Sequence, residues 1–482
     1  MDIRPNGAVP LTGSQLTVDT LVALARSTRE VTLSAAAEER IRHSREVLLS
    51  QQRARVIYGR NSGVGALKGT AVPNDVSFDL NMLRSHATSG GGEVPAETIR
   101  AMMVIRINQL ARGGAGVSLD ACRRLVELVN RNEYPRIYWG GALGTGDMPQ
   151  LAAVGLLLAT PSSSTEPQGR GSLARGDAIG LISSSALTLA DSALAIHGML
   201  RMLKASTVVA ALTWLAVRGN REHFSDAATP SLRTPDAIRV ARWLTSLLGD
   251  EVYAAPRVQE SFALRVFPSS VGAVLGVRQQ VLGITEELIN ASVENPLIDA
   301  SAGVVVHHGG FYNLDLALAL DSAAMGLAHL STFALSRIGL LTNTSNTGVP
   351  EYLGDGSPGS SGVMMLEYLA AWHVASMRAA ANPASVQVVS VSHNVEENAS
   401  FASVSAHRLA DLCSSYASIV ACELVTSVRA LRLARITPCG PRLTAALAIC
   451  DDLPADLADR DLTEDIAAAT NLLSSLADAL EG

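Results

Sequence analysis

Aromatic side chains are scarce in this 482-residue chain, at 4% of residues, although 48% of residues are hydrophobic. The apolar mass therefore comes from Ala, Leu, Val and Ile, which fill the cores between packed helices. Charged residues are also few, at 17%. The composition predicts an α-rich globular enzyme with a large core, and a rule of about 150 residues per domain would allow about three domains.

The chain also lacks a basic excess, since 38 Lys and Arg stand against 45 Asp and Glu and give a formal net charge of −7. This balance argues against nucleic acid as the main partner. The five cysteines, at 122, 413, 422, 439 and 450, are odd in number and form no CxxC pair. Their spacing predicts neither a metal site nor a disulfide framework.

Targeting signals are missing as well. The first 19 residues lack the basic-then-apolar pattern of a secretory signal. Uncharged apolar stretches such as 208–217 fall short of the roughly 20 residues that a membrane-spanning helix needs. We therefore expect a cytoplasmic protein that does not associate with a membrane.

Helical periodicity dominates the rest of the chain, and Gly, Pro and Asn clusters interrupt it. No βαβ alternation is present, which argues against a nucleotide-binding sheet. The length of the expected helical segments predicts a bundle of long antiparallel helices. We expect three parts: an N-terminal part (1–178), a central bundle (179–450) and a C-terminal helical cap (451–482). The expected helical segments are 16–49, 96–130, 152–159, 179–218, 270–292, 314–341, 362–380 and 399–433.

The loops between these helices hold most of the chemically able residues. The segment Tyr58–Gly65 places a phenol on a loop that three glycines make permissive. Tyr58 can act as a general base if a nearby cation or helix N-terminus lowers its pKa. The alternative is an ordinary turn with a packing tyrosine.

Tyr58–Gly65 resembles the YGxNTGFG loop of the histidine and phenylalanine ammonia-lyases and the related aminomutases, and Asn61 keeps the asparagine of that loop. Further landmarks follow in the same order over about residues 15–435, which makes the resemblance specific. They are His86 in the SHA segment, Arg265 in QESFALR (family QDxYSLR), 290–297 (family NSATDNPL), 382–386 (family HPASV) and Glu396 in HNVEEN (family ANQEDH).

The resemblance implies a mainly α, long-helix bundle of the aromatic amino acid ammonia-lyase (fumarase/aspartase-like) fold. It also implies a homotetramer whose active sites combine loops from several subunits, which suits long apolar helices. The substrate is then a small molecule with a carboxylate or carbonyl group.

The family builds its electrophile, a methylidene-imidazolone, from an Ala-Ser-Gly tripeptide. Gly144-Thr145-Gly146 follows Tyr134-Pro135 and precedes an apolar helix, as the family's tripeptide does, whereas Ala174-Arg175-Gly176 offers no β-hydroxyl to eliminate. Dehydration of Thr145 would leave an ethylidene whose methyl group hinders attack. We therefore expect Thr145 to stay unmodified and the chain to use no cofactor, with a ring formed from residues 144–146 as the alternative.

Other departures surround the expected pocket. The family's second catalytic tyrosine is Phe262 here, which cannot donate or accept a proton. Polar family positions appear as Ser183 in LISSSA, as Gly310 and Tyr312 in HGGFYN, and as Ser360 in GSSGV. Substrate handling must therefore differ from that of an ordinary histidine or phenylalanine ammonia-lyase.

The retained residues suggest roles. Tyr58 is the expected base, and Arg265 is expected to hold a carboxylate through two parallel hydrogen bonds, unless it forms a structural ion pair. Glu396 sets the protonation of a neighbouring base or is a solvated acid. His86 falls near the expected pocket. His307 and His308 are either pocket acids, bases or metal ligands, or turn histidines without such a role.

Three functions follow from these residues. The leading hypothesis is a diverged enzyme of this family that performs acid-base elimination, addition or isomerisation next to a carboxylate or carbonyl, with Tyr58, Thr145 and Glu396 in the catalytic centre. The second is a conventional ammonia-lyase or 2,3-aminomutase with a ring formed from residues 144–146. The third is a catalytically silent scaffold or partner subunit.

Overall fold

A computed structural model describes residues 7–160, 173–249 and 253–480. The chain is mainly helical, and its strands form three two-stranded sheets within this described part. The predicted fold class is therefore confirmed. The chain divides into a first unit (Met1–His197, Val281–Asp321 and Pro383–His407) and a second unit (Gly198–Gln280, Ser322–Asn382 and Arg408–Gly482).

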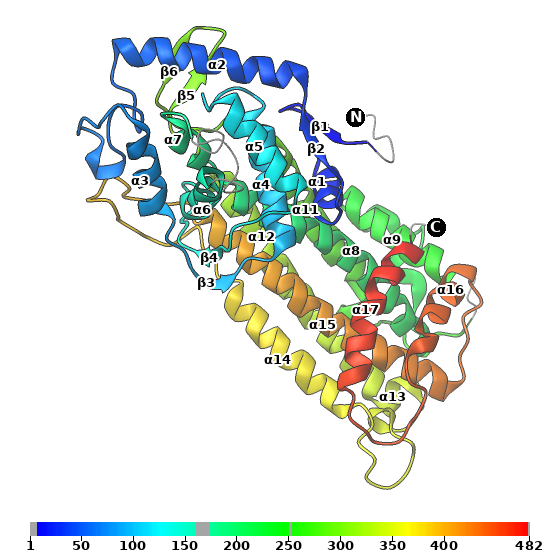
Figure 1. The fold of residues 1–482 in the computed structure, drawn as a ribbon. Coiled ribbons are helices and arrows are strands. Elements are labelled where there is room, and N and C mark those ends of the chain that lie inside the picture. Colours follow the sequence, from blue (N-terminus) through cyan, green and yellow to red (C-terminus); the bar gives the residue numbers. More distant parts are fainter. Residues whose placement is uncertain (1–6, 161–172, 250–252, 481–482) are drawn as a thin grey trace. The chain divides into compact units, whose positions relative to one another are not determined.

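The first unit contains short helices and all six strands of the described part (Figure 1). Its elements are β1 (Val9–Leu11), α1 (Val18–Ala25), β2 (Val31–Leu33), α2 (Ala35–Ala54), α3 (Val76–His86), β3 (Gly90–Glu93), α4 (Ala96–Leu110), α5 (Leu119–Asn130), β4 (Tyr138–Gly140), α6 (Met148–Ala159), α7 (Asp177–Ile182), β5 (Leu297–Asp299) and β6 (Val304–Val306). Strands β1 and β2 pair in parallel, whereas β3–β4 and β5–β6 are antiparallel.

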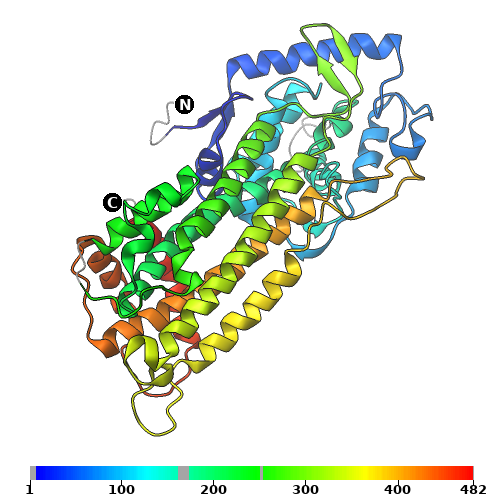
Figure 2. The same cartoon turned by 180° about the vertical axis from the view of Figure 1, so that it is seen from behind.

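In the described part of the chain, four long α-helices begin in one unit and end in the other, and six α-helices belong to the second unit alone. The long helices are α8 (Ala186–Ala216), α11 (Phe267–Ile289), α12 (Leu314–Thr342) and α15 (Ala402–Ala434). The helices of the second unit are α9 (Pro235–Leu248), α10 (Phe262–Arg265), α13 (Thr344–Thr347), α14 (Met364–Ala380), α16 (Pro441–Ile449) and α17 (Thr463–Ala479). Within that unit α12, α14 and α15 run side by side (Figure 2).

Helix α4 forms the centre of the first unit, because 13 of its 15 residues are buried. Its buried polar side chains tie the end of α11 and the segment after it to the core. Arg106 Nη1 pairs with Glu294 Oε1 at 3.0 Å, and Asn108 Nδ2 donates to the Ile289 carbonyl at 2.9 Å. Such pairing offsets the cost of burying these groups, and it fixes the chain next to Asn295.

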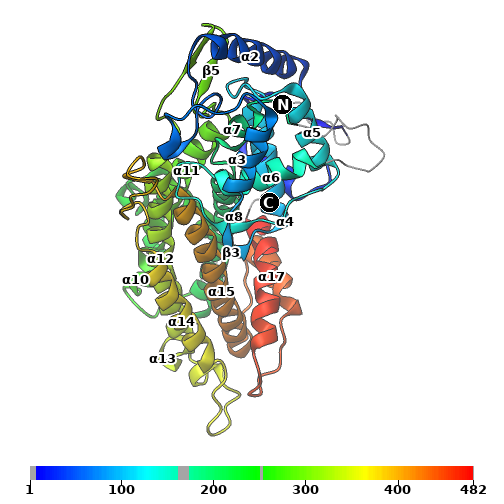
Figure 3. The ribbon, with the colours of Figure 1, turned by 60° about the vertical axis from the view of Figure 1, so that its left-hand side comes forward.

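Helices α3, α6 and α7 pack against one another beside this centre (Figure 3). The β5–β6 hairpin, lime green in Figure 2, lies against α2. Leu48 and Ile57 form a buried cluster with Ile298 and Val305 of that hairpin. This cluster fixes the start of the loop that carries Tyr58.

Interruptions separate segments that the sequence predicted as continuous helices. The predicted helix at 96–130 is broken between α4 and α5, where Gly113 and Gly116 have φ of +87° and +62°. The predicted helix at 179–218 is broken at 183–185, between α7 and α8. Strand β2 interrupts the pattern at 16–49 because it pairs with β1. Strand pairing thus overrides helical periodicity at β2, and glycines with positive φ interrupt it between α4 and α5.

Two helical stretches, Asp177–Ala216 and Leu314–Thr342, are long and apolar enough to cross a membrane by length and composition. Both stretches contain charged residues, so their uncharged runs remain shorter than about 20 residues, as the sequence predicted. Their most apolar windows are 89% and 61% buried within the protein, as core helices of soluble proteins also are.

The second unit has its own buried polar pair. Arg337 Nε and Nη2 each lie 2.7 Å from a carboxylate oxygen of Glu423, and Thr213 donates to the same carboxylate. Removing one partner of such a pair leaves an uncompensated buried charge, which costs about 3–5 kcal/mol. The pair therefore holds α8, α12 and α15 together within the second unit.

Candidate active site

A cavity of about 500 Å³ lies within the first unit and brings together four predicted catalytic or binding residues, Tyr58, Thr145, Ser183 and Glu396. Five apolar side chains and several polar groups complete its wall. The remaining lining residues are Val56, Ser62, Gly65, Lys68, Met148, Ile179, Asn295, His307, Phe311 and Val395.

Tyr58 is half-buried on a loop that its own hydrogen bonds shape. Its hydroxyl accepts a hydrogen bond from the Gly65 amide at 2.8 Å, and its own amide donates to His307 Nε2 at 3.2 Å. Gly59 has φ of +68°, and a Cβ there would lie 2.7 Å from Ile179. The loop therefore packs directly on α7.

The pKa of Tyr58 is raised, first by burial and then by the negative charge of Glu396, while the Gly65 amide opposes the shift. The sequence resemblance predicted that Tyr58 acts as a base, which requires a lowered pKa. The surroundings of Tyr58 within the first unit instead raise its pKa. A phenol with a raised pKa is protonated at neutral pH. Tyr58 is therefore equipped to donate a proton.

Thr145 and Glu396 are the second pair in the cavity. The Thr145 hydroxyl donates to Glu396 Oε2 at 3.3 Å, and both residues are half-buried. Backbone hydrogen bonds between Val391 and Glu396 hold the acid in place. The structure thus places a carboxylate against the hydroxyl of Thr145, the residue that the sequence resemblance aligns with the family's central serine.

Three consecutive carbonyls before Thr145 are bound by the segment at the start of α15. The Ser403 hydroxyl donates to Ala142 O at 2.9 Å, the Phe401 amide to Leu143 O at 2.8 Å and the Ser400 hydroxyl to Gly144 O at 3.0 Å. These bonds fix the backbone of the loop and hence the direction of Thr145.

Gly144 leaves no room for a side chain. Its φ is +94°, and a Cβ would clash with the Ser400 hydroxyl and lie 2.8 Å from the Ala402 amide nitrogen. The alanine of the family's Ala-Ser-Gly tripeptide therefore does not fit here without a backbone shift. Thr145 in place of serine adds a methyl group at the carbon that would be attacked.

Asp147 follows the loop and is fully buried at the start of α6. Its two oxygens accept hydrogen bonds from the Thr188 amide at 2.7 Å and the Thr188 hydroxyl at 2.9 Å. Burial raises the pKa of Asp147 to about 6 although these bonds oppose the shift. Asp147 therefore anchors the loop to α8.

The other residues predicted in the first unit have mostly local contacts. Ser183 lines the cavity, and its hydroxyl accepts from the Asn295 amide at 2.9 Å. Asn61 does not line it: its carbonyl oxygen accepts from the Ile57 amide at 2.6 Å and so shapes the Tyr58 loop. His86 Nδ1 lies 2.8 Å from the Met82 carbonyl within α3. Tyr312 is half-buried beside the lining residue Phe311.

Arg265, Phe262 and Ser360 belong to the second unit. Arg265 Nη1 donates to Gln259 Oε1 at 2.6 Å, and its guanidinium lies over the Phe262 ring at 4.7 Å. Phe262 is 62% exposed. The Ser360 hydroxyl donates to Asp459 Oδ1 at 2.9 Å.

The two adjacent histidines have different positions. His307 lines the cavity, and burial and the Arg55 charge lower its pKa, so its neutral ring accepts from the Tyr58 amide. His308 Nε2 lies 2.7 Å from the Glu294 carbonyl, and its Nδ1 accepts from the Gly310 amide at 2.9 Å. Within residues 7–160, 173–249 and 253–480, no group of three or more His, Cys, Asp or Glu could hold a metal ion.

Sequence reasoning missed several lining residues. Asn295 and Phe311 fall inside the motifs at 290–297 and 308–313, so a signal for them existed. Lys68 and Met148 lie just beyond the Tyr58 loop and the 144–146 tripeptide. Nothing in their residue types marked them, because only the folded loops bring them to one cavity.

Comparison with known proteins identifies the family of the chain. A family model described as aromatic amino acid lyase matches residues 16–452. Histidine ammonia-lyase of Caldanaerobacter subterraneus is 30% identical over 448 residues, which cover 88% of each chain. Histidine ammonia-lyase of Gloeobacter violaceus is 30% identical and covers 96% of this chain and 95% of its own.

Solved structures share the fold. Ergothionase from Treponema denticola superposes with a TM-score of 0.89 at 22% identity, over 97% of this chain and 99% of its own. Tyrosine aminomutase from Streptomyces globisporus has a TM-score of 0.89 at 23% identity, over 98% of both chains. These likenesses confirm the predicted fold. The match over residues 16–452 and the histidine ammonia-lyase relatives confirm the family resemblance and the lyase class: the chain belongs to the aromatic amino acid lyase family.

Proposed function

We propose that this chain is an acid-base enzyme that eliminates, adds or isomerises a group next to a carboxylate or carbonyl, without a ring at residues 144–146. The observation that carries the proposal is the Thr145 hydroxyl bound to Glu396 in the same cavity as Tyr58. Thr145 in place of serine supports a linear, unmodified tripeptide, because its methyl group would stand on the carbon that a substrate attacks.

An imidazolone electrophile would activate the substrate for removal of a weakly acidic proton. Without that group, the C–H bond that breaks must be acidified by a neighbouring carbonyl or carboxylate. The leaving group must then stand on the next carbon. Glu396 takes that proton, directly or through the Thr145 hydroxyl. Tyr58, kept protonated, delivers its proton to the departing group, so that one C–H bond and one bond to the leaving group break while a double bond forms. Proton transfer from Glu396 to Tyr58 through solvent restores both.

Residues of the same cavity and of the second unit are proposed to bind the substrate. Ser183 and Asn295 offer polar contacts inside the cavity. We propose that Arg265 binds the carboxylate, with Phe262, Ser360, Tyr312, His86 and Asn61 shaping the site around the substrate. Arg265 then reaches the cavity within an assembly of several subunits.

We propose the homotetramer as that assembly and the cytoplasm as its location. Met365, Tyr368 and Trp372 support an assembly, because they form an apolar stripe along α14 and are 60%, 62% and 64% exposed. Such a stripe suits burial against another copy of the chain.

A conventional amino acid ammonia-lyase or aminomutase is the second candidate. The names of the relatives favour it, and Thr145 keeps a hydroxyl next to Gly146. In that case the Gly146 nitrogen would attack the Gly144 carbonyl with loss of one water, and Thr145 would lose a second.

Mass spectrometry separates the two candidates. The tryptic peptide 137–170 contains the tripeptide, and the isosteric variant Thr145→Val, which has no hydroxyl to lose, is the matched control. The proposal expects the wild-type peptide at its unmodified mass. Loss of two waters in the wild type but not in the control would overturn it and establish the ring.

Turnover completes the test. Amino acids are screened for ultraviolet-absorbing acrylate products, alongside carboxylic acids that carry a leaving group one carbon beyond the acidic position. Turnover of the second group with an unmodified peptide supports the proposal. Inactivity on both, with a partner protein recovered in stoichiometric complex, would instead establish the silent scaffold.

A further inference from the structure

Arg60, two residues after Tyr58, is fully buried although it carries a charge. Its Nη2 donates to the Ala115 carbonyl at 2.7 Å. Its Nε and Nη1 have no hydrogen-bond partner among the described residues. Burial, reinforced by the positive charge of Arg45, lowers the pKa of Arg60 to about 9. The Arg60 guanidinium is therefore desolvated without a full set of hydrogen-bond partners.

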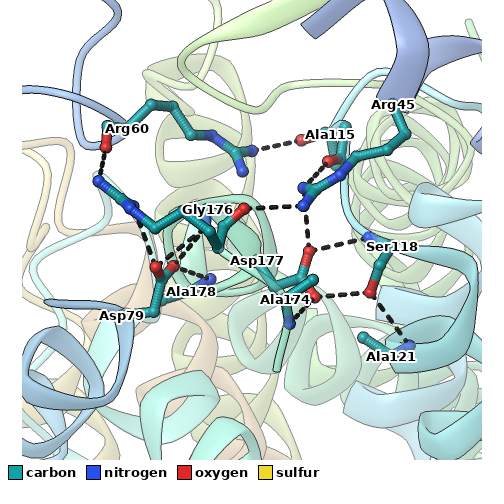
Figure 4. A network of polar contacts seen from close by, with 12 residues as sticks. Arg45, Arg60, Asp79, Ala115, Ser118, Ala121, Ala174, Gly176, Asp177 and Ala178 are labelled. Atoms are coloured by element: carbon teal, nitrogen blue, oxygen red, sulfur yellow. Dashed lines mark hydrogen bonds and ion pairs between the residues drawn. The ribbon is translucent and has the colours of Figure 1, made fainter. Parts of the chain in front are cut away.

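A polar network surrounds Arg60 at the start of α7 (Figure 4). Asp79 accepts from Arg175 Nη1 at 3.0 Å and from the Gly176 amide at 2.9 Å. Arg175 in turn donates to the backbone carbonyl of Arg60. Asp177 accepts from Arg45 Nη1 at 3.2 Å. Three guanidinium groups thus face two carboxylates, so the network has one positive charge more than it needs for neutrality.

Glycines make the room that the Arg60 guanidinium fills. A Cβ on Gly176 would lie 2.6 Å from Nη1, and a Cβ on Gly180 would lie 2.8 Å from Nη2. On the other side, Gly59 packs on Ile179. The Tyr58 loop is thus joined to α7 through the Arg60 side chain and through Gly59. Tyr58 lines one wall of the cavity, and Ile179 and Ser183 line another.

Stability does not explain a cation in this position. A buried charge with unpaired donors is costly, and hydrophobic replacements of buried ionic groups are often neutral or stabilising. We infer that Arg60 is a positioning residue that fixes the Tyr58 loop on α7 and so sets where the Tyr58 phenol stands in the cavity. Its meaning for catalysis rests on the function proposed above, but the position itself is measurable without turnover.

Fluorine NMR reports that position. The chain is labelled with 3-fluorotyrosine, and Tyr58→Phe assigns the Tyr58 resonance. In Arg60→Met we expect this resonance to shift and broaden while the melting temperature stays equal or rises. Arg60→Lys, whose ammonium group can still bind the Ala115 carbonyl, should keep the resonance near its wild-type place. Arg84→Met, an exposed arginine on α3, is the control that should change neither.

Two outcomes would overturn the inference. One is an Arg60→Met variant that melts like the wild type and leaves the Tyr58 resonance unchanged. The other is an Arg60→Met variant that fails to fold while Arg60→Lys folds, because that would assign Arg60 a purely structural role. If Tyr58→Phe retains full turnover, the proposed function fails, and the resonance shift still decides the inference.

Discussion

Thr145 Oγ1 lies 3.3 Å from Glu396 Oε2, across 251 residues of sequence. The carboxylate orients the hydroxyl that the family would consume in making its electrophile. An intact hydroxyl in this contact can pass a proton between the cavity and the carboxylate. Ring formation would remove this hydroxyl, so the Thr145 hydroxyl can relay a proton to Glu396 only if residues 144–146 stay unmodified.

Replacing Glu396 tests the base. Glu396→Gln keeps the shape and an acceptor for Thr145 but removes the charge, so turnover should fall by about 10²- to 10⁴-fold, the usual contribution of a general acid or base. The adjacent exposed acid provides the control, Glu397→Gln, which should retain turnover. Equal turnover in both variants would exclude Glu396 as the base.

Replacing Tyr58 tests the acid. Tyr58→Phe removes the donated proton and should lower turnover by about 10²- to 10⁴-fold. Because the pKa of Tyr58 is raised above its ordinary value near 10, the wild type should show no loss from ionisation of this phenol up to about pH 10. Tyr138→Phe, outside the cavity lining, is the control. A wild-type rate that falls as pH rises from about 7 to 9, with Tyr58→Phe insensitive, would contradict a raised pKa.

Much of the fold could be predicted from periodicity. The predicted helix at 314–341 corresponds to α12, and that at 399–433 to α15, because long uninterrupted patterns leave no competing structure. The breaks at Gly113 and at Ser183 were not predicted. After Gly113 the backbone turns so that the Ala115 carbonyl accepts from Arg60, and the second break places Ser183 in the cavity wall. Hydrophobic periodicity does not predict such contacts.

The site was predictable only where motifs mark it. Tyr58, Thr145 and Glu396 could be proposed because each stands in a segment that resembles the family, and all three line one cavity. The direction of the Tyr58 pKa was not predictable, since it depends on burial and on Glu396, which is distant in sequence. Arg60 was missed because its position in the motif gives no hint that its guanidinium is buried.

Gly144→Ala tests the crowding beside Thr145. The new Cβ would meet Ser400 and the Ala402 backbone at a residue with φ of +94°, so the variant should lose about 1–3 kcal/mol of unfolding free energy from overpacking. Gly309→Ala, where a Cβ would meet nothing within 4 Å, is the control and should change stability little. Urea denaturation measures both. A Gly144→Ala variant as stable as the control would show that the loop has room for the family's alanine.

The buried Asp147 gives a pH-dependent prediction. Its pKa is raised from 3.8 to about 6, so the folded chain binds this proton more tightly than the unfolded chain does. Stability from this group is therefore present below about pH 4, falls as pH rises towards 6, and stays lost above it. Asp147→Asn cannot ionise, and its amide can satisfy Thr188 by accepting from the backbone N–H and donating to the hydroxyl.

Urea denaturation of Asp147→Asn and wild type across about pH 5 to pH 8 checks this linkage, because the difference between the two cancels the other titrating groups. We expect the variant to gain on the wild type by about 1.4 kcal/mol over this window, because only the last pKa unit of the shift, from about pH 5 to pH 6, falls within it. Asp226→Asn, an exposed acid in the second unit, should show no such trend. A difference that is constant with pH would mean that Asp147 titrates alike in both states, and the loop would then be anchored by a carboxylate that is ionised throughout this range.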